Sequence, residues 1–362
     1  MITIKNTTKY IKSHPISILL ISLPLVFISK AAGWSAVWVF SLSCLGVIPM
    51  AGYIGEATEA LAERTGPKIG GLLNATLGNA AELIITLVAI QAGLLELVKA
   101  SITGSIIGNL LLVLGFAMVF GGIKNGTQIF DKRQSTNNAV LLTLAILALI
   151  VPSLFSHSIG QEGSIKVEAL SLGVAVVMII LYGLGILYSL KALRSPVTYQ
   201  SDVNVIHPHW SVKKSVIVLG LATTAVVILS EVLVGAIDIV VADFGLSEFF
   251  LGIILIPIVG NAAEHLVAVQ VAIRNKMELS VEIAVSSSLQ IALLVAPILV
   301  FISLIMGHPL TLIFNQFELL ALGGAVVVAV MVSSDGESNW LEGAALLAVY
   351  LIFSLAFFLL PA

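Results

Sequence analysis

Long apolar runs recur along the whole of this 362-residue chain, and they limit its fold more than any other feature. A helix needs about 20 apolar residues to cross a hydrocarbon core of about 30 Å. Charged residues make up only 10% of the chain, whereas a typical soluble domain has about 25%. The sequence therefore predicts an all-α polytopic membrane protein with eleven spans. These spans cover residues 16–30, 34–58, 69–93, 97–121, 137–155, 168–190, 214–241, 247–272, 280–306, 313–333 and 340–360.

Lysine and arginine residues predict the orientation of these spans, because cytoplasmic loops of membrane proteins are enriched in them. With the N-terminus in the cytoplasm, only Lys30, Lys99 and Lys166 fall on the outer side, and the other 14 of the 17 Lys and Arg fall on the inner side. Since the number of spans is odd, we expect the C-terminus outside. One missed or invented span would invert every later loop and remove this asymmetry.

A five-residue motif, Gly-Asn-Ala-Ala-Glu, occurs at residues 78–82 and again at 260–264, an offset of 182. The same offset aligns Ser105 with Ser287 without a gap. The copies lie in the third and eighth spans, an odd number of spans apart, so they cross the membrane in opposite directions. Transporters use such inverted repeats, with the substrate near the midplane of the bilayer. We expect an N-terminal segment with the first span (1–33), repeat A with five spans (34–191), a cytoplasmic linker (192–213) and repeat B with five spans (214–362).

Glycines and a proline near the two motifs predict interrupted helices. Gly70 and Gly78 lie before and at the start of the first copy. Gly252, Pro257 and Gly260 lie before and at the start of the second. An interruption frees backbone carbonyl groups, and such backbone is tolerated at membrane depth where it lines a cavity. We therefore expect a break in both copies.

The two glutamates of the motif, Glu82 and Glu264, lie near the middle of apolar spans. A charge at that depth costs roughly 2.5–3.5 kcal/mol on insertion scales and usually marks function rather than packing. Asn79 and Asn261 lie three residues earlier, on the same helix face as the carboxylates. Two inverted copies would bring these oxygen donors together, and hard cations such as Ca²⁺ take about 6–8 oxygen ligands. We predict a cation site made by these four residues.

Polar residues on the fourth and ninth spans are candidates to complete this shell, as additional ligands or as supports for the ligands. The alternative is that they form ordinary interhelical hydrogen bonds. These residues are Ser105, Asn109, Ser287 and Gln290.

A second acidic pair, Glu59 and Glu231, lies near the ends of the second and seventh spans. One acid near each mouth could gather cations or act as a gate. The alternative is that both are solvated by the headgroup region.

The same two carboxylates are expected to bind protons when the cation leaves. Burial and mutual repulsion favour the protonated form of each carboxyl group, and a divalent cation favours the ionised form. Cation and proton therefore compete for Glu82 and Glu264, which is the physical basis of an antiporter. We expect Ca²⁺ as a transported substrate rather than a cofactor, and we expect no cofactor.

Other classes of function fit the sequence less well. A net charge of -3 gives no basic patch for nucleic acid. The sequence contains neither HExxH nor G-x-S-x-G, so we predict that the protein is not an enzyme. A channel can select cations with rings of acids, but two inverted acids at mid-depth fit a two-sided carrier better. The sequence makes no prediction of oligomeric state.

The two Gly-Asn-Ala-Ala-Glu motifs resemble the signature repeats of the Ca²⁺/H⁺ antiporter (CAX) family, within the Ca²⁺/cation antiporter superfamily. The stretches at 104–109, 289–292 and 334–340 resemble that family as well. The resemblance implies eleven helices in an inverted five-plus-five core, alternating access, and Glu82 and Glu264 as the acids that carry ion and protons.

The chain departs from the family pattern in three places. The linker contains a single acid, Asp202, where relatives often have an acidic segment, and Ser286-Ser287 stands where the family has Gly-Ser. The long N-terminal extension of plant relatives is missing, which favours a prokaryotic plasma membrane. The alternative on the same fold is a Na⁺-coupled Ca²⁺ exchanger, or an antiporter for Mn²⁺, Na⁺ or K⁺. Na⁺-coupled relatives typically have hydroxyl residues where this chain has Asn79 and Asn261.

Overall fold

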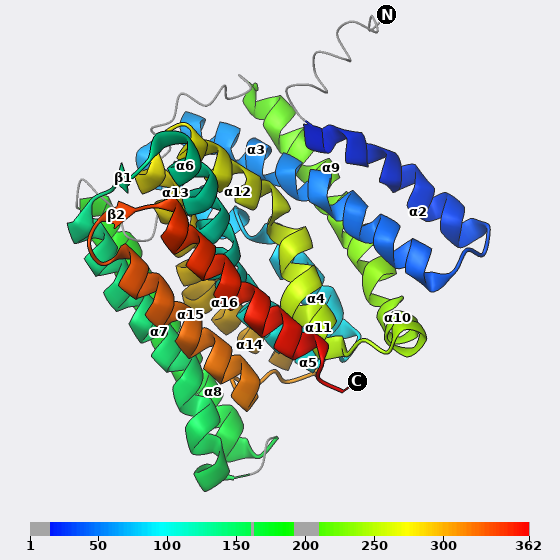
Figure 1. Ribbon diagram of the computed structural model, residues 1–362. Coiled ribbons are helices and arrows are strands. Elements are labelled where there is room, and N and C mark those ends of the chain that lie inside the picture. The colour runs from blue at the N-terminus through cyan, green and yellow to red at the C-terminus, as the bar shows by residue number, and fades with distance from the viewer. Residues whose placement is uncertain (1–14, 161–162, 192–209, 362) are drawn as a thin grey trace, which may run out of the picture.

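The computed structural model describes residues 15–160, 163–191 and 210–361, and these residues are almost entirely helical (Figure 1). Among them, nine helices are long and apolar enough to cross a membrane, and two shorter apolar helices cover Ile16–Ala31 and Ala80–Gln91. Together they correspond to the predicted spans. The helices are η1 (Pro15–Ile21), α2 (Ser22–Ala31), α3 (Ala36–Leu77), α4 (Ala80–Gln91), α5 (Leu95–Ile107), η2 (Gly108–Val113), α6 (Leu114–Asn125), α7 (Lys132–Ile159), α8 (Ile165–Lys191), α9 (Val212–Val234), α10 (Ile237–Phe244), α11 (Glu248–Phe250), η3 (Leu251–Leu255), α12 (Ile256–Ile273), α13 (Met277–Gln290), η4 (Ile291–Val295), α14 (Ala296–Ile305), α15 (Gln316–Ser333) and α16 (Trp340–Phe358).

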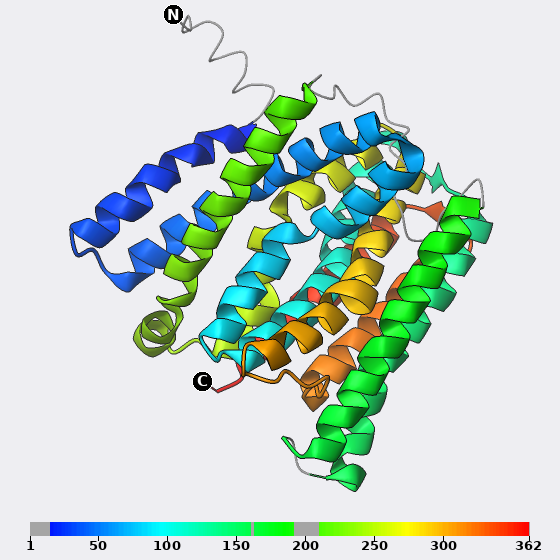
Figure 2. The same ribbon diagram turned by 180° about the vertical axis from the view of Figure 1, so that it is seen from behind.

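Most long helices run across the molecule between two opposite sides (Figures 1 and 2). Helices α7 and α8 form a hairpin at one edge, whereas α2 packs on α3 near α9 at the other edge. We call the side that contains the short strands the strand side, and the side where the chain ends the opposite side. Nearly all of the buried apolar side chains form one continuous core.

Two short strands are an exception to the predicted all-α fold. Strand β1 (Gln128–Ile129) pairs antiparallel with β2 (Glu337–Ser338), and the Phe130 N–H donates to Gly336 O at 2.9 Å. This pairing joins the loop after α6 to the loop after α15. It therefore links the two repeats on the strand side. Most of the predicted linker, residues 192–209, lies outside the described residues.

The second and third predicted spans are not separated by a loop at 59–68, because helix α3 continues through this region. A Cβ on Gly70 would lie only 2.3 Å from Ala62 O. In a straight helix, residues eight apart are separated by about 12 Å, so α3 is sharply bent between these positions. Pro67 lies between them in the sequence, and a proline within a helix removes a backbone hydrogen bond and causes a kink. The reversal of direction is thus made by a bent helix.

The seventh predicted span is shorter than the sequence indicated. Helix α9 ends at Val234, and residues 237–244 form the separate helix α10. Figure 1 shows α10 nearly end-on beside the lower end of α9, so the two helices run in different directions. Gly235, which follows α9, marks this change.

The two motif copies differ in backbone conformation. In repeat A the helix breaks at Gly78 and Asn79, between α3 and α4, as the sequence predicts. In repeat B the predicted break is wrong, because α12 is continuous from Ile256 through Gly260 and Glu264. The irregularity lies earlier, in the π-helical segment η3, and Pro257 occupies the first turn of α12, where a missing N–H costs little.

Two further π-helical segments follow the aligned serines at equivalent places in the repeats. Segment η2 begins three residues after Ser105, and η4 begins four residues after Ser287. Such segments are rare and often occur at functional sites, since they change the direction of the side chains that follow. Asn109 lies within η2, and Gln290 is the residue directly before η4.

Candidate functional site

Glu82 lies at the start of α4 and is held by neutral donors from both repeats. Its Oε1 accepts a hydrogen bond from Ser105 Oγ of α5 and another from Asn261 Nδ2 of α12, at 2.5 Å in the second case. The side chain is only 3% exposed. Its Oε2 is buried and has no hydrogen-bond partner among the described residues. One carboxylate oxygen therefore remains available to a ligand.

Glu264, in the interior of α12, has a looser environment. Ser287 Oγ lies 3.1 Å from its Oε2, a contact that repeats the pairing of Ser105 with Glu82. Glu264 is partly exposed, whereas Glu82 is buried. The two acids thus have equivalent serine partners but unequal access to solvent.

The remaining predicted site residues connect the two repeats. Asn79 Nδ2 donates to Gln290 Oε1 at 2.7 Å, and Asn109 Nδ2 donates to Ser287 Oγ at 3.0 Å. Ser287 Oγ also lies 3.4 Å from Asn79 Oδ1. All the amide and hydroxyl groups predicted for the site are buried and belong to one polar cluster. The structure therefore brings together Glu82, Glu264, Asn79, Asn261, Ser105, Asn109, Ser287 and Gln290.

The glycine of each motif provides space for the glutamate of the other repeat. A Cβ on Gly260 would lie 3.0 Å from Cγ of Glu82, and a Cβ on Gly78 would lie 3.6 Å from Oε1 of Glu264. The motifs therefore face each other, with each glutamate packed against the opposite glycine. This reciprocal arrangement explains why both residues recur together in the repeat.

The polar cluster offers oxygen ligands and has no built-in counter-charge. Among the described residues, neither Glu82 nor Glu264 has an ion pair with a basic side chain, and no group of three or more His, Cys, Asp and Glu residues could hold a metal. Two carboxylates surrounded by amides and hydroxyls suit a hard cation or protons better than a soft metal. Glu82 also lies in the first turn of α4, where the helix dipole favours a negative charge.

Glu59 and Glu231 lie on α3 and α9, not on the helices that carry the cluster. Glu59 is partly buried near the bend of α3, where Ala57 and Ala60 pack against Trp210, and Glu231 is exposed near the end of α9. The hydroxyl residues that directly precede the two acids, Thr58 and Ser230, are fully buried. A role of the two acids in gating stays a prediction.

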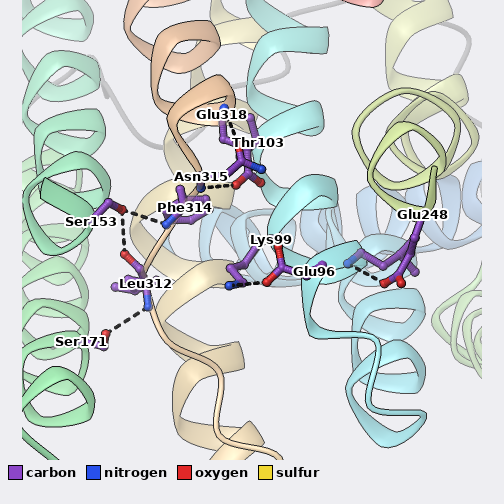
Figure 3. A network of polar contacts seen from close by, with 11 residues as sticks. Glu96, Lys99, Thr103, Ser153, Ser171, Glu248, Leu312, Phe314, Asn315 and Glu318 are labelled. Carbon is purple, nitrogen blue, oxygen red and sulfur yellow. Dashed lines mark hydrogen bonds and ion pairs between the residues drawn. The ribbon is translucent and has the colours of Figure 1, made fainter. Parts of the chain in front are cut away.

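A buried acid that the sequence reasoning missed is Glu318, which is 1% exposed in the first turn of α15 (Figure 3). Its Oε2 accepts from the Asn315 N–H at 2.8 Å, and its Oε1 lies 3.4 Å from Thr103 Oγ1 of α5. Lys99 is buried one turn before Thr103 and pairs with Glu96 at 2.7 Å. The spacing of Asn315 and Glu318 is that of a capping box, a sequence signal that could have placed this acid at a helix start.

The fold and the polar cluster define a membrane carrier built from two inverted repeats around a pair of acids. The chain matches the sodium/calcium exchanger protein family over residues 35–191 and 214–359, and it belongs to that family. It is 44% identical to the Ca²⁺/H⁺ antiporter of Aphanothece halophytica, with 95% of this chain and 96% of that protein covered. It is 43% identical to the Ca²⁺/H⁺ antiporter ChaA of Bacillus subtilis, over 93% of this chain and 96% of that protein.

Solved structures support the same assignment of the fold. The structure of native YfkE superposes with a TM-score of 0.84 at 41% identity, covering 95% of this chain and 100% of that one. A crystal structure of the H⁺/Ca²⁺ exchanger CAX has a TM-score of 0.72 at 20% identity, covering 96% and 92%, and at that identity it shows the fold alone. The chain is thus a multi-pass integral membrane protein with inverted repeats.

Proposed function

We propose that this protein exchanges Ca²⁺ for H⁺ across a membrane by alternating access. The observation that carries the proposal is the pair of inverted glutamates, Glu82 and Glu264, held by neutral donors and free of basic partners among the described residues. The relatives named Ca²⁺/H⁺ antiporters, at 43–44% identity over nearly the whole chain, support the choice of ions. The protein then acts as a carrier and not as an enzyme.

The chemistry of the exchange follows from the charge of the site. Two ionised carboxylates carry two negative charges, which one Ca²⁺ or two protons neutralise equally. Leaving both acids ionised and empty at membrane depth is costly, so the carrier changes conformation when either substrate is bound. Asn79 and Asn261 are suited to supply neutral oxygen ligands that complete the shell for Ca²⁺, and the nearby serines and Gln290 are suited to hold the ligands in place.

The strand side is the cytoplasmic side in this proposal. The basic residues at the helix ends and in the described loops on that side include Lys124, Lys132, Arg133, Arg274 and Lys276, as the positive-inside rule requires. The N-terminus is then cytoplasmic and the C-terminus outside. The bacterial relatives support a prokaryotic plasma membrane as the location, with the lipid bilayer, Ca²⁺ and H⁺ as the partners.

The experiment that tests this function measures Ca²⁺ uptake into proteoliposomes of the purified protein. An imposed proton gradient should drive saturable uptake, and a sodium gradient of equal size should not. Uptake driven by sodium alone would show a Na⁺-coupled exchanger instead. Ca²⁺ flux that does not saturate and does not follow the pH gradient would indicate a channel.

A further inference from the structure

On the opposite side of the molecule, the two repeats are in direct backbone contact. A Cβ on Gly104 of α5 would lie 2.0 Å from Ile253 O, and a Cβ on Gly252 would lie 2.9 Å from Leu97 O. Both distances are shorter than any real Cβ contact, so this packing requires glycine at both positions. Glu248 Oε1 strengthens the same contact by accepting from the Leu97 N–H at 3.1 Å (Figure 3). The outer half of α5 is therefore sealed against η3 and α12.

The repeat offset of 182 identifies the equivalent contact on the strand side. Gly252 corresponds to Gly70, and Gly104 corresponds to Ser286. Among the described residues, the three atoms nearest to a Cβ on Gly70 all belong to Ala62 of its own helix, not to the other repeat. The two equivalent glycines therefore pack differently, and the tight contact is found on one side of the site.

Closing the strand side by the same packing would place residue 286 where Gly104 now lies. At Gly104 even one added carbon would overlap a backbone oxygen at 2.0 Å. Ser286 carries that carbon and also a hydroxyl group, which donates to Glu282 O at 2.5 Å. Interiors are packed too densely to absorb such a group without displacement. The strand side thus cannot close as tightly as the opposite side.

We propose that Ser286 biases the exchange cycle toward the arrangement seen here, in which the opposite side is closed. The inference rests on the alternating access of the proposed function and adds a residue that sets the balance between its two states. Ser286 acts through helix packing and binds neither ion.

The test measures how fast a cysteine buried in the closed contact reacts with a membrane-impermeant maleimide added from the outer side. Leu97 is 1% exposed in that contact, so Leu97→Cys in a Cys44→Ser background is the reporter. Adding Ser286→Gly should raise the reaction rate several-fold, because the state with an open outer side becomes more populated. Gly104→Ala, which opposes closure of the outer side, should raise it as well and is the positive control.

Ser288→Gly is the matched control for Ser286→Gly. Its hydroxyl donates to Ala284 O at 2.9 Å, the same kind of bond within α13, and Ser288 is buried as Ser286 is. This variant loses the same bond and gains the same backbone freedom, but it should leave the rate unchanged. An unchanged rate in Ser286→Gly, or an equal rise in Ser288→Gly, overturns the inference. Because labelling does not require transport, failure of Ca²⁺/H⁺ exchange would be seen separately in the flux assay.

Discussion

The Cγ atom of Glu82 lies 3.0 Å from the point that a Cβ would occupy on Gly260. Through this contact the carboxylate of repeat A reaches into the motif of repeat B, where Asn261 donates to it. The position of one acid is therefore fixed by a residue with no side chain in the other repeat. This contact couples the geometry of the site to the packing between the two repeats. A carrier needs such coupling if its site is to open to one side of the membrane and then to the other.

Replacing Gly260 by alanine should displace Glu82, because the added carbon is closer than nine in ten real contacts of this kind. A shift of this size at a site that needs defined geometry should lower exchange about tenfold or more. Initial rates of Ca²⁺ uptake at several Ca²⁺ concentrations measure the effect. Gly220→Ala in α9 is the control, since nothing lies within 4 Å of its Cβ position. Equal loss in both variants would point to general instability.

The hydrogen bond between Asn79 and Gln290 should couple these two residues in a double-mutant cycle. The bond is 2.7 Å long and buried, and it joins the two repeats. Asn79→Ala and Gln290→Ala should be non-additive by about 1 kcal/mol in the free energy of Ca²⁺ binding. Calcium titration of the four proteins provides the four values. Strict additivity would mean that the bond is not present when Ca²⁺ binds.

Calcium binding should weaken as the pH falls, because protons occupy the same carboxylates. If binding displaces protons from both acids, the apparent dissociation constant should rise by up to about a hundredfold per pH unit in the range where both are protonated. Calcium titration of the purified protein across a series of pH values measures this slope. Glu168→Gln, in the first turn of α8, should leave the slope unchanged. A pH-independent constant would show that cation and proton bind separately.

Glu318→Ala should destabilise the fold more than Glu342→Ala does. Each glutamate accepts from the N-cap residue of its own capping box, at 2.8 Å from the Asn315 N–H and 3.1 Å from the Asn339 N–H. Glu318 is also buried and contacts Thr103 of the other repeat. We expect a difference of about 1–3 kcal/mol in the free energy of unfolding. Thermal unfolding in detergent compares the two variants, and equal losses would show that only the helix caps matter.

Much of the architecture follows from the sequence because the bilayer imposes a simple rule. Backbone polar groups in lipid must be paired within a helix, so apolar length predicts spans. Among the described residues, nine of the eleven predicted regions contain a helix long enough to span, and the first and third contain shorter apolar helices. The motif repeat likewise predicted which residues meet. An offset and a direction are enough to bring Glu82, Glu264, Asn79 and Asn261 into one cluster.

The asymmetry between the repeats could not be predicted from the repeated motif. Identical Gly-Asn-Ala-Ala-Glu segments form a broken helix in one copy and a continuous helix in the other. Local sequence allows both conformations, and the packing of the whole molecule selects between them. The bend of α3 could not be predicted in full either. The sequence contains a proline there, but it does not reveal the close approach of Gly70 to Ala62. Glu318 was missed because its burial results from contacts between distant parts of the chain, such as the one with Thr103.

The central claim is that Glu82 and Glu264 bind Ca²⁺ and protons in turn. The most direct test is Ca²⁺ uptake into proteoliposomes under an imposed pH gradient, with wild type, Glu82→Gln and Glu264→Gln compared side by side. Glutamine keeps an oxygen that the neighbouring hydroxyl and amide donors can reach, so both variants should fold and reconstitute. The account predicts that both lose proton-driven Ca²⁺ uptake. Uptake at the wild-type rate in either variant would contradict it.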